Sequence, residues 1–280
     1  MNTLLISRAL SFIPILGLLI AGCSKPPPIP DGALRNTIQH DGQDWNYDVY
    51  LPDNYDPDKT YWPLIQLYGP PGLNQLASER GLDAIVIRTG GFKNNFSGTG
   101  NGDYLKKVIR EVRSKYKVRD KILITGHSAG AGVGHRFTLQ NPEWVHAAAP
   151  YSSGSWTTPD GRYLMTGRRG ETPREVPHEE VEALLTNHER ENQRLGAKLA
   201  GLKAQPGAEK IPFLVMCGTL DPRWEFGKRF AQILEENGYY VETEWPETNH
   251  VIGRGSNSEV ESARYNKRII DFFLRMTADK

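Results

Sequence analysis

The residues Gly126-His127-Ser128-Ala129-Gly130 form a G-x-S-x-G pentapeptide, a spacing that can present a serine as a nucleophile. The pentapeptide follows an apolar, strand-like segment at Lys121–Thr125 and opens a run of small residues with helical character. A tight turn from strand to helix strains the serine backbone, so the positions two before and two after it must be glycine or nearly so. The hydroxyl then stands at a helix start, where backbone N–H groups favour negative charge. We therefore predict that Ser128 is a nucleophile.

The glycines of this segment allow two other interpretations. A dinucleotide-binding fingerprint is one, because Gly130, Gly132 and Gly134 follow in series, but their G-x-G-x-G spacing is one residue short of G-x-G-x-x-G. Close packing of the helix on a sheet is the other, and it is a reasonable account of Gly132 and Gly134. It does not explain the serine.

A serine hydroxyl needs a base to take its proton and an acid to orient that base. On a strand–turn–helix scaffold of this kind the chain order is serine, acid, histidine. Asp221 lies a few residues beyond the apolar segment Ile211–Cys217 and is followed by Pro222, which places it at the carboxyl edge of a sheet. An Asp turn or helix N-cap would also suit Asp221, and Glu225 is the competing acid. We predict that Asp221 is the acid.

Of the seven histidines, His250 lies in the loop between the last expected strand and the last expected helix. Such a loop can place an imidazole between Asp221 and Ser128. His127 adjoins the serine, but its side chain must point elsewhere on the turn. The others lie within expected elements, where packing is the better account, or outside the relevant loops: His135 and His146, then His40, His178 and His188. We predict that His250 is the base.

The oxyanion of an acyl-transfer reaction needs hydrogen-bond donors. The N–H of Ala129, next to the serine, is expected to supply one. The second should come from the turn after the central strand, Tyr68-Gly69-Pro70-Pro71-Gly72, in which the two prolines have no N–H to donate. Either the Tyr68 hydroxyl or an N–H of Gly69 or Gly72 could serve, and we favour Tyr68. No metal or organic cofactor is expected.

From about residue 32 onward the chain alternates strand-like and helical segments, which predicts βαβ units and a mostly parallel sheet covered on both faces. The expected strands are Trp45–Leu51, Pro63–Tyr68, Ala84–Ile87, Lys121–Thr125, Val145–Pro150, Ile211–Cys217 and Tyr239–Trp245. The expected helices lie near 105–116, 129–139, 225–236 and 258–276.

The segment 152–210 interrupts this alternation and shows no strand pattern. Thr172-Pro173-Arg174-Glu175 has the form of a helix start, and six apolar residues then recur at helical spacing: Val181, Leu184, Leu185, Leu195, Leu199 and Leu202. We expect a helical insertion after the strand Val145–Pro150, either a surface helix or a partial cap over the site. Trp156 is expected in a loop, as an apolar wall of the substrate pocket or as surface packing.

Together these residues resemble the α/β-hydrolase fold, and the resemblance covers essentially everything after residue 32. Tyr47–Pro52, Gly102–Leu105 and the GHSAG turn are similar to secreted esterases of the polyhydroxybutyrate depolymerase and feruloyl or acetyl-xylan esterase type. Tyr68-Gly69-Pro70 looks more like the prolyl oligopeptidase branch, in which a tyrosine hydroxyl completes the oxyanion hole. The resemblance implies a serine hydrolase acting on small or polymeric esters. A peptidase and a non-catalytic binding lipoprotein are the alternatives.

Composition narrows the class of protein further. The 280-residue chain has 34 basic and 33 acidic residues, and a net charge of +1 provides no broad basic surface for nucleic acid. Two cysteines cannot build a disulfide scaffold or a four-cysteine zinc site. We therefore expect neither a nucleic-acid module nor a small disulfide-bonded domain.

The first residues have the pattern of an export signal. The apolar run from Ala9 to Ala21 is broken by Pro14 and is too short to span a bilayer. Leu19–Cys23 resembles the lipobox of bacterial lipoproteins, which implies a signal at 1–22, a lipidated Cys23, a proline-rich tether at 23–31 and a hydrolase domain at 32–280. By that resemblance the protein is anchored in the bacterial cell envelope, on an outer membrane, and Cys217 is a free, buried thiol. An uncleaved anchor and an ordinary signal cut elsewhere are the alternatives.

Overall fold

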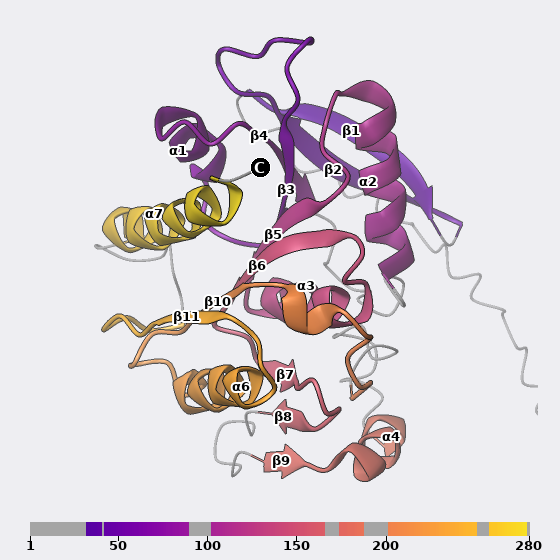
Figure 1. Cartoon of the computed structure of the whole chain (residues 1–280), viewed down its shortest axis with the longest axis vertical. Coiled ribbons are helices and arrows are strands. Elements are labelled where there is room, and N and C mark those ends of the chain that lie inside the picture. Colours follow the sequence, from indigo (N-terminus) through magenta and orange to yellow (C-terminus); the bar gives the residue numbers. More distant parts are fainter. Residues whose placement is uncertain are drawn as a thin grey trace, which may run out of the picture.

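An eight-stranded, mostly parallel sheet forms the centre of the chain (Figure 1). The computed structural model describes residues 32–40, 42–89, 102–165, 174–187, 201–250 and 258–278. In spatial order the strands are β1 (Leu34–His40), β2 (Gln43–Tyr50), β4 (Ala84–Thr89), β3 (Trp62–Leu67), β5 (Ile122–His127), β6 (Val145–Tyr151), β10 (Phe213–Met216) and β11 (Val241–Glu244). β2 pairs antiparallel with both β1 and β4, and every other neighbouring pair is parallel.

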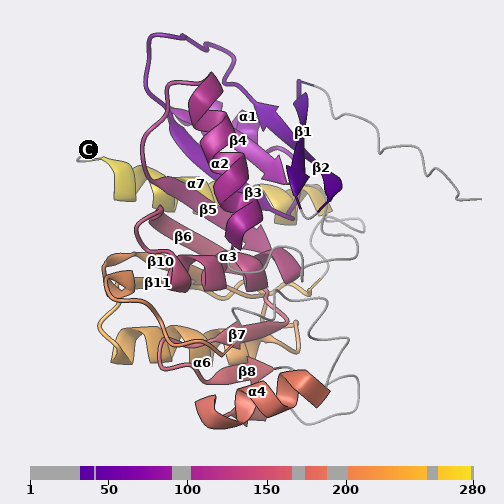
Figure 2. The same ribbon diagram turned by 90° about the vertical axis from the view of Figure 1, so that its right-hand side faces the viewer.

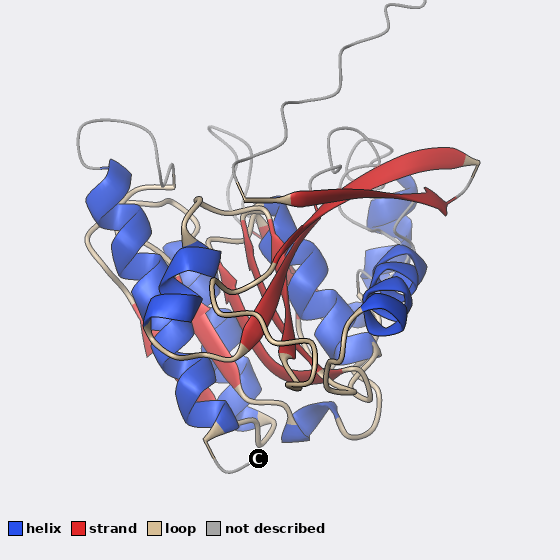
Figure 3. Cartoon of the chain, turned by 90° about the horizontal axis from the view of Figure 1, so that it is seen from above, coloured by secondary structure: helices blue, strands red, loops and turns tan. Residues whose placement is uncertain are grey.

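Helices cover both faces of this sheet, as Figure 3 shows, because the central strands are apolar on both sides. Successive residues of β3 point to opposite faces, so Leu64 and Ile65 belong to different core clusters. One cluster includes side chains of α1 (Leu73–Glu79) and α7 (Ser258–Thr277). The other includes side chains of α2 (Asp103–Lys115), α3 (Ala129–Gln140) and α6 (Trp224–Glu236). The expected mostly parallel sheet with helices on both faces is confirmed.

Parallel strands bring residues far apart in the sequence to one edge of the sheet. Leu67 at the end of β3 pairs with Gly126 of β5, and Tyr151 at the end of β6 pairs with both His127 and Met216. The loops that leave β3, β5, β6 and β10 therefore begin at the same carboxyl edge, where α/β sheets hold their ligands.

The insertion after β6 differs from the expected helical segment. It contains a second, three-stranded antiparallel sheet of β7 (Ser155–Thr157), β8 (Tyr163–Met165) and β9 (Arg174–Val176). Arg174 and Glu175 lie in β9, so the helix start expected there is wrong. The helix α4 (His178–Asn187) begins later, and η3 (Ala208–Lys210) is a short 3-10 turn. Strands of three residues are too short to leave a sequence pattern.

Part of the expected apolar stripe can be placed in the structure. Val181 is buried on α4, whereas Leu202 follows a turn and is 41% exposed. Thr172, Pro173, Leu195 and Leu199 lie outside the described residues.

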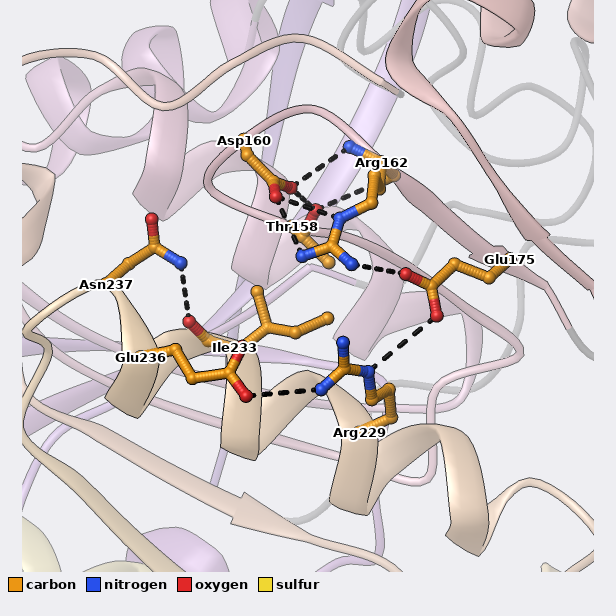
Figure 4. A network of polar contacts seen from close by, with 8 residues as sticks. All are labelled: Thr158, Asp160, Arg162, Glu175, Arg229, Ile233, Glu236 and Asn237. Carbon is orange, nitrogen blue, oxygen red and sulfur yellow. Dashed lines mark hydrogen bonds and ion pairs between the residues drawn. The ribbon is translucent and has the colours of Figure 1, made fainter.

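The small sheet packs beside α3 and α6, at the end of the molecule opposite β1 (Figure 2). A chain of ion pairs joins it to α6 (Figure 4). Arg162 pairs with Asp160 at 2.8 Å and with Glu175 of β9, and Glu175 also lies 3.7 Å from Arg229 of α6. Exposed pairs contribute little individually, but a connected network with several partners fixes the orientation of the two elements.

Among the described residues, no helix is long and apolar enough to cross a bilayer. The expected signal, Cys23 and the proline-rich tether all lie within residues 1–31, outside the described residues. Cys217 is a buried free thiol, as expected.

Candidate active site

Ser128 lies at the sharp turn between β5 and α3. Its backbone has φ 54° and ψ −116°, a conformation that costs a non-glycine residue about 1–3 kcal/mol. A Cβ on Gly130 would lie 1.8 Å from the Leu67 carbonyl oxygen of β3, and one on Gly126 would lie 2.6 Å from the Gly130 backbone. Both glycines are therefore required by the close approach of backbone segments. Gly132 differs, because a Cβ there would make only ordinary contacts, the nearest at 3.6 Å.

The three predicted triad side chains form one line of hydrogen bonds. The Ser128 Oγ lies 3.0 Å from His250 Nε2, and His250 Nδ1 lies 2.8 Å from Asp221 Oδ2. An ionised carboxylate only accepts hydrogen bonds, so Nδ1 carries the imidazole proton. In the neutral ring Nε2 is then free to accept the serine hydroxyl proton. Glu225, the competing acid, is on α6, where its carboxylate is 62% exposed and lies 3.8 Å from Lys228.

The loops that carry Asp221 and His250 are held together by their backbones. The Thr219 N–H donates to the Pro246 carbonyl at 2.8 Å, and the Leu220 N–H donates to the Thr248 carbonyl at 3.0 Å. A Cβ on Gly218 would lie 2.0 Å from that same Thr248 oxygen, so only glycine permits this approach. These backbone hydrogen bonds therefore determine how far apart the Asp221 and His250 backbones lie.

Asp221 is completely buried, and several neighbouring groups stabilise the negative charge of its carboxylate. Its Oδ1 accepts hydrogen bonds from the backbone N–H of Arg223 at 3.1 Å and from the Arg223 guanidinium at 3.0 Å. Burial raises the pKa of this carboxyl, but the His250 hydrogen bond and the Arg223 charge outweigh burial and hold the pKa below its usual value. Arg223 was not predicted as a site residue, although its place in the sequence, two residues after the acid, is a signal that could have identified it.

Cys217 lies behind the acid, with its Sγ 3.7 Å from Asp221 Oδ2. Burial, together with the nearby Asp221 charge, raises the pKa of this thiol to about 12. The thiol is therefore protonated at neutral pH and presents a hydrogen, rather than a second negative charge, to the carboxylate.

His127 contacts the loop of the predicted base. Its Nε2 lies 3.1 Å from the His250 carbonyl oxygen, and the two imidazole centroids are 5.0 Å apart. Burial lowers the pKa of His127 to about 4, so the ring is neutral at pH 7. Because a carbonyl can only accept, Nε2 must carry the proton. His127 thus donates to the His250 carbonyl and helps to hold His250 in place.

The two predicted oxyanion donors lie on either side of the Leu67–Gly130 contact. Ala129 is the first residue of α3, and the first N–H groups of a helix have no partner within it. Tyr68 directly follows β3, has φ 58°, and its side chain is 48% exposed at the carboxyl edge.

Trp156 is not in a loop, contrary to expectation. It lies in β7, is 0% exposed, and stacks on Phe230 of α6 with ring centroids 4.4 Å apart. A side chain without accessible surface cannot form a wall of a substrate pocket, so its role here is packing. His135 contacts the same aromatic pair and donates its Nδ1 hydrogen to the Ala131 carbonyl at 2.7 Å.

Substitution of Gly130 by alanine should disrupt the serine turn. The added methyl would overlap the β3 backbone, and we expect a loss of stability of at least about 2 kcal/mol together with loss of activity. Gly132→Ala, two residues further along α3, is the matched control and should stabilise the protein by about 0.5–1 kcal/mol. Urea unfolding of both variants measures the difference. Equal effects at the two positions would contradict the close approach described above.

Removal of the Arg223 charge should change the pH dependence of any activity at this site. The guanidinium opposes protonation of Asp221, so Arg223→Met should raise the pKa of that carboxyl and move the acid limb of kcat/KM to higher pH by about half to one unit. Arg229→Met, on the same helix but paired with Glu175, is the control and should leave the limb in place. An unchanged acid limb in Arg223→Met would show that its charge does not act on the acid.

No protein-family model and no curated protein sequence matches the chain. Many solved structures are similar to it. Esterase 2 of Thermogutta terrifontis, with butyrate bound, has a TM-score of 0.62 at 17% identity, covering 90% of this chain and 96% of the other. The fluorophosphonate-binding serine hydrolase FphF of Staphylococcus aureus has a TM-score of 0.55 at 17% identity, covering 87% and 96%. A Rhizomucor miehei esterase has a TM-score of 0.57 at 14% identity, covering 87% and 84%.

These identities are too low to carry an activity from one protein to another, but the coverage extends over nearly the whole of each chain. The strand order and the serine turn described above agree with the same architecture. The chain therefore has the α/β-hydrolase fold.

Proposed function

We propose that this protein is a serine hydrolase that cleaves carboxylic esters through an acyl-enzyme. The observation that carries the proposal is the unbroken line of hydrogen bonds from Ser128 through His250 to the buried Asp221. This line joins a hydroxyl, an imidazole and an ionised carboxylate in the order that nucleophilic catalysis requires.

In the first half of the reaction the Ser128 Oγ attacks the ester carbonyl carbon while its proton passes to His250 Nε2. Asp221 stabilises the resulting imidazolium and keeps its orientation. The carbonyl oxygen becomes an oxyanion that accepts hydrogen bonds from the Ala129 N–H and the Tyr68 hydroxyl. Collapse of the tetrahedral intermediate breaks the ester C–O bond, and the imidazolium protonates the departing alkoxide.

In the second half a water molecule gives a proton to His250 Nε2 and attacks the acyl-enzyme carbonyl. Collapse of the second intermediate releases the acid, and the imidazolium returns the proton to Ser128 Oγ. Atoms and charges balance without any group beyond the protein side chains and water.

The structural neighbours favour esters over other acyl compounds. The esterase of Thermogutta terrifontis has been solved with butyrate and with propionate, and also phosphonylated by sarin. The Staphylococcus aureus neighbour is described as binding fluorophosphonate. These similarities support the proposal that this chain cleaves esters.

A fluorophosphonate probe followed by peptide mass spectrometry tests the nucleophile. We expect one modified residue, Ser128, and we expect Ser128→Ala to lower kcat by about 10⁴- to 10⁶-fold while unfolding at the same urea concentration. A folded wild-type protein that remains unlabelled would favour a binding lipoprotein. Turnover by Ser128→Ala within tenfold of the wild type would refute the assignment.

A serine peptidase is the second candidate, because the Tyr68-Gly69-Pro70 turn resembles that of oligopeptidases. A panel of p-nitrophenyl esters and aminoacyl anilides, assayed with the wild type and Ser128→Ala, separates the two activities. The ester proposal predicts serine-dependent turnover of the esters, and anilide turnover at a higher kcat/KM would replace it with a peptidase.

We further propose that the enzyme is exported and anchored to the bacterial cell envelope by a lipid on Cys23. Because Cys217 is buried, a lipid attached to it is not sterically possible in the folded protein. Cys23→Ser should abolish lipid attachment and release the protein from the membrane fraction, or leave it unprocessed. Cys217→Ser is the matched control and should still fractionate with membranes. Unchanged processing and fractionation of Cys23→Ser would rule out the anchor.

A further inference from the structure

The turn that follows β3 has an unusual backbone. Tyr68, Gly69 and Gly72 have φ values of 58°, 142° and 87°, all in the region that favours glycine. A tyrosine in this region is strained, and strain of this kind persists only where the surroundings impose it. The groups that impose it here come from four elements around the turn.

Three consecutive carbonyl groups of the turn each accept a hydrogen bond from a side chain. The Arg88 guanidinium of β4 donates to the Gly69 oxygen at 3.0 Å. The Gln66 amide of β3 donates to the Pro70 oxygen at 3.0 Å, and the Asn266 amide of α7 donates to the Pro71 oxygen at 2.9 Å. Gln66 and Asn266 are each only 3% exposed, so the turn is bound to the protein interior.

The turn also packs closely against β6. A Cβ on Gly69 would lie 2.8 Å from the Tyr151 hydroxyl oxygen, so the backbone at this position rests on a fully buried side chain. Four elements, β3, β4, β6 and α7, thus contact one turn of five residues. A turn that is bound to strands and a helix is held more rigidly than a turn that is bound to other loops.

These hydrogen bonds to the turn carbonyls determine which hydrogen-bond donors of the turn can face the site. In a trans peptide the C=O and the following N–H point in opposite directions. The Gly69 and Pro70 carbonyls point to their interior donors, and the nitrogens of the same peptide units belong to Pro70 and Pro71, which carry no hydrogen. The outward side of these two peptide units therefore offers no N–H donor to an oxyanion. The donors that remain in the turn are the Tyr68 hydroxyl and the N–H groups of Gly69 and Gly72, and the proposed mechanism uses the Tyr68 hydroxyl.

We propose that Arg88, Gln66 and Asn266 are positioning residues that hold the strained turn, and through it the Tyr68 hydroxyl, in the geometry required to stabilise the oxyanion. This inference rests on the proposed serine hydrolase function. Arg88 is its most informative member, because its bond to the Gly69 carbonyl is charge-assisted and spans from a neighbouring strand directly to the residue after Tyr68.

Steady-state kinetics with a p-nitrophenyl ester test the proposal in a double-mutant cycle. Tyr68→Phe should lower kcat by roughly 10²- to 10³-fold, as expected for loss of an oxyanion donor. Arg88→Met keeps the length of the side chain, removes the donor and should lower kcat by about 10- to 100-fold with KM changed less than about threefold. Because Arg88 acts through Tyr68, the double variant should be no slower than Tyr68→Phe alone.

Two further variants separate positioning from general destabilisation. Arg88→Lys retains one donor and should recover most of kcat, and it serves as the test if Arg88→Met does not fold. Arg80→Met removes a guanidinium at the end of α1 that pairs with Asp271 of α7, and it should match the wild type. Fluorophosphonate labelling of Ser128 shows whether the nucleophile itself remains intact in each variant.

The outcomes distinguish this inference from the function on which it rests. A labelled, active wild type with Arg88→Met within twofold in kcat would overturn the positioning role and leave the hydrolase proposal standing. Losses of Arg88→Met and Tyr68→Phe that multiply in the double variant would also overturn it, because the two residues would then act independently. A wild type without label and without ester turnover would remove both proposals.

Discussion

The site depends on backbone segments that approach more closely than any side chain allows. Gly130 and Gly126 bring the serine turn against the last residue of β3, and Gly218 brings the acid loop against Thr248 of the histidine loop. These backbone contacts determine where Ser128, Asp221 and His250 lie relative to one another. The hydrogen bonds between the three side chains then form within that arrangement. The strained φ of Ser128 follows from the first contact, since the chain must reverse within one residue to reach α3.

Electrostatics then determine the protonation state of the site. A fully buried carboxylate would be costly alone, but Asp221 receives hydrogen bonds from Arg223, from the His250 imidazole and from the protonated thiol of Cys217. The depressed pKa of Asp221 keeps it ionised, which fixes the hydrogen of His250 on Nδ1 and leaves Nε2 toward Ser128. The neutral His127 holds the other side of the same loop through the His250 carbonyl. Each of these groups acts on the serine through the imidazole.

The features of the site that leave a local pattern in the sequence could be predicted from it. A pentapeptide between an apolar strand and a small-residue helix indicated Ser128, and chain order with position after a strand indicated Asp221 and His250. The central strands could be predicted because both of their faces are buried, which makes them continuous apolar runs. β1 was missed because it is a polar edge strand, and the three-residue strands of the small sheet are too short for any periodicity.

The remaining features depend on contacts between distant parts of the chain. Asn266 contacts Pro71 across 195 positions, and no local pattern in α7 distinguishes it from other polar residues on that helix. The burial of Trp156 depends on Phe230 of α6, so a segment rich in serine and glycine gave the opposite expectation. Gly218 resembles an ordinary turn glycine until Thr248 is placed beside it.

If Asp221 orients and charges the imidazole, the reactivity of Ser128 depends on that buried acid. The second-order rate constant for modification of Ser128 by an organophosphonate can be measured in Asp221→Asn and in Glu225→Gln, a matched loss of charge at the competing acid. We predict that Asp221→Asn reacts about 10³- to 10⁴-fold more slowly than the wild type and that Glu225→Gln reacts at the wild-type rate. Equal rates for the wild type and Asp221→Asn would contradict it.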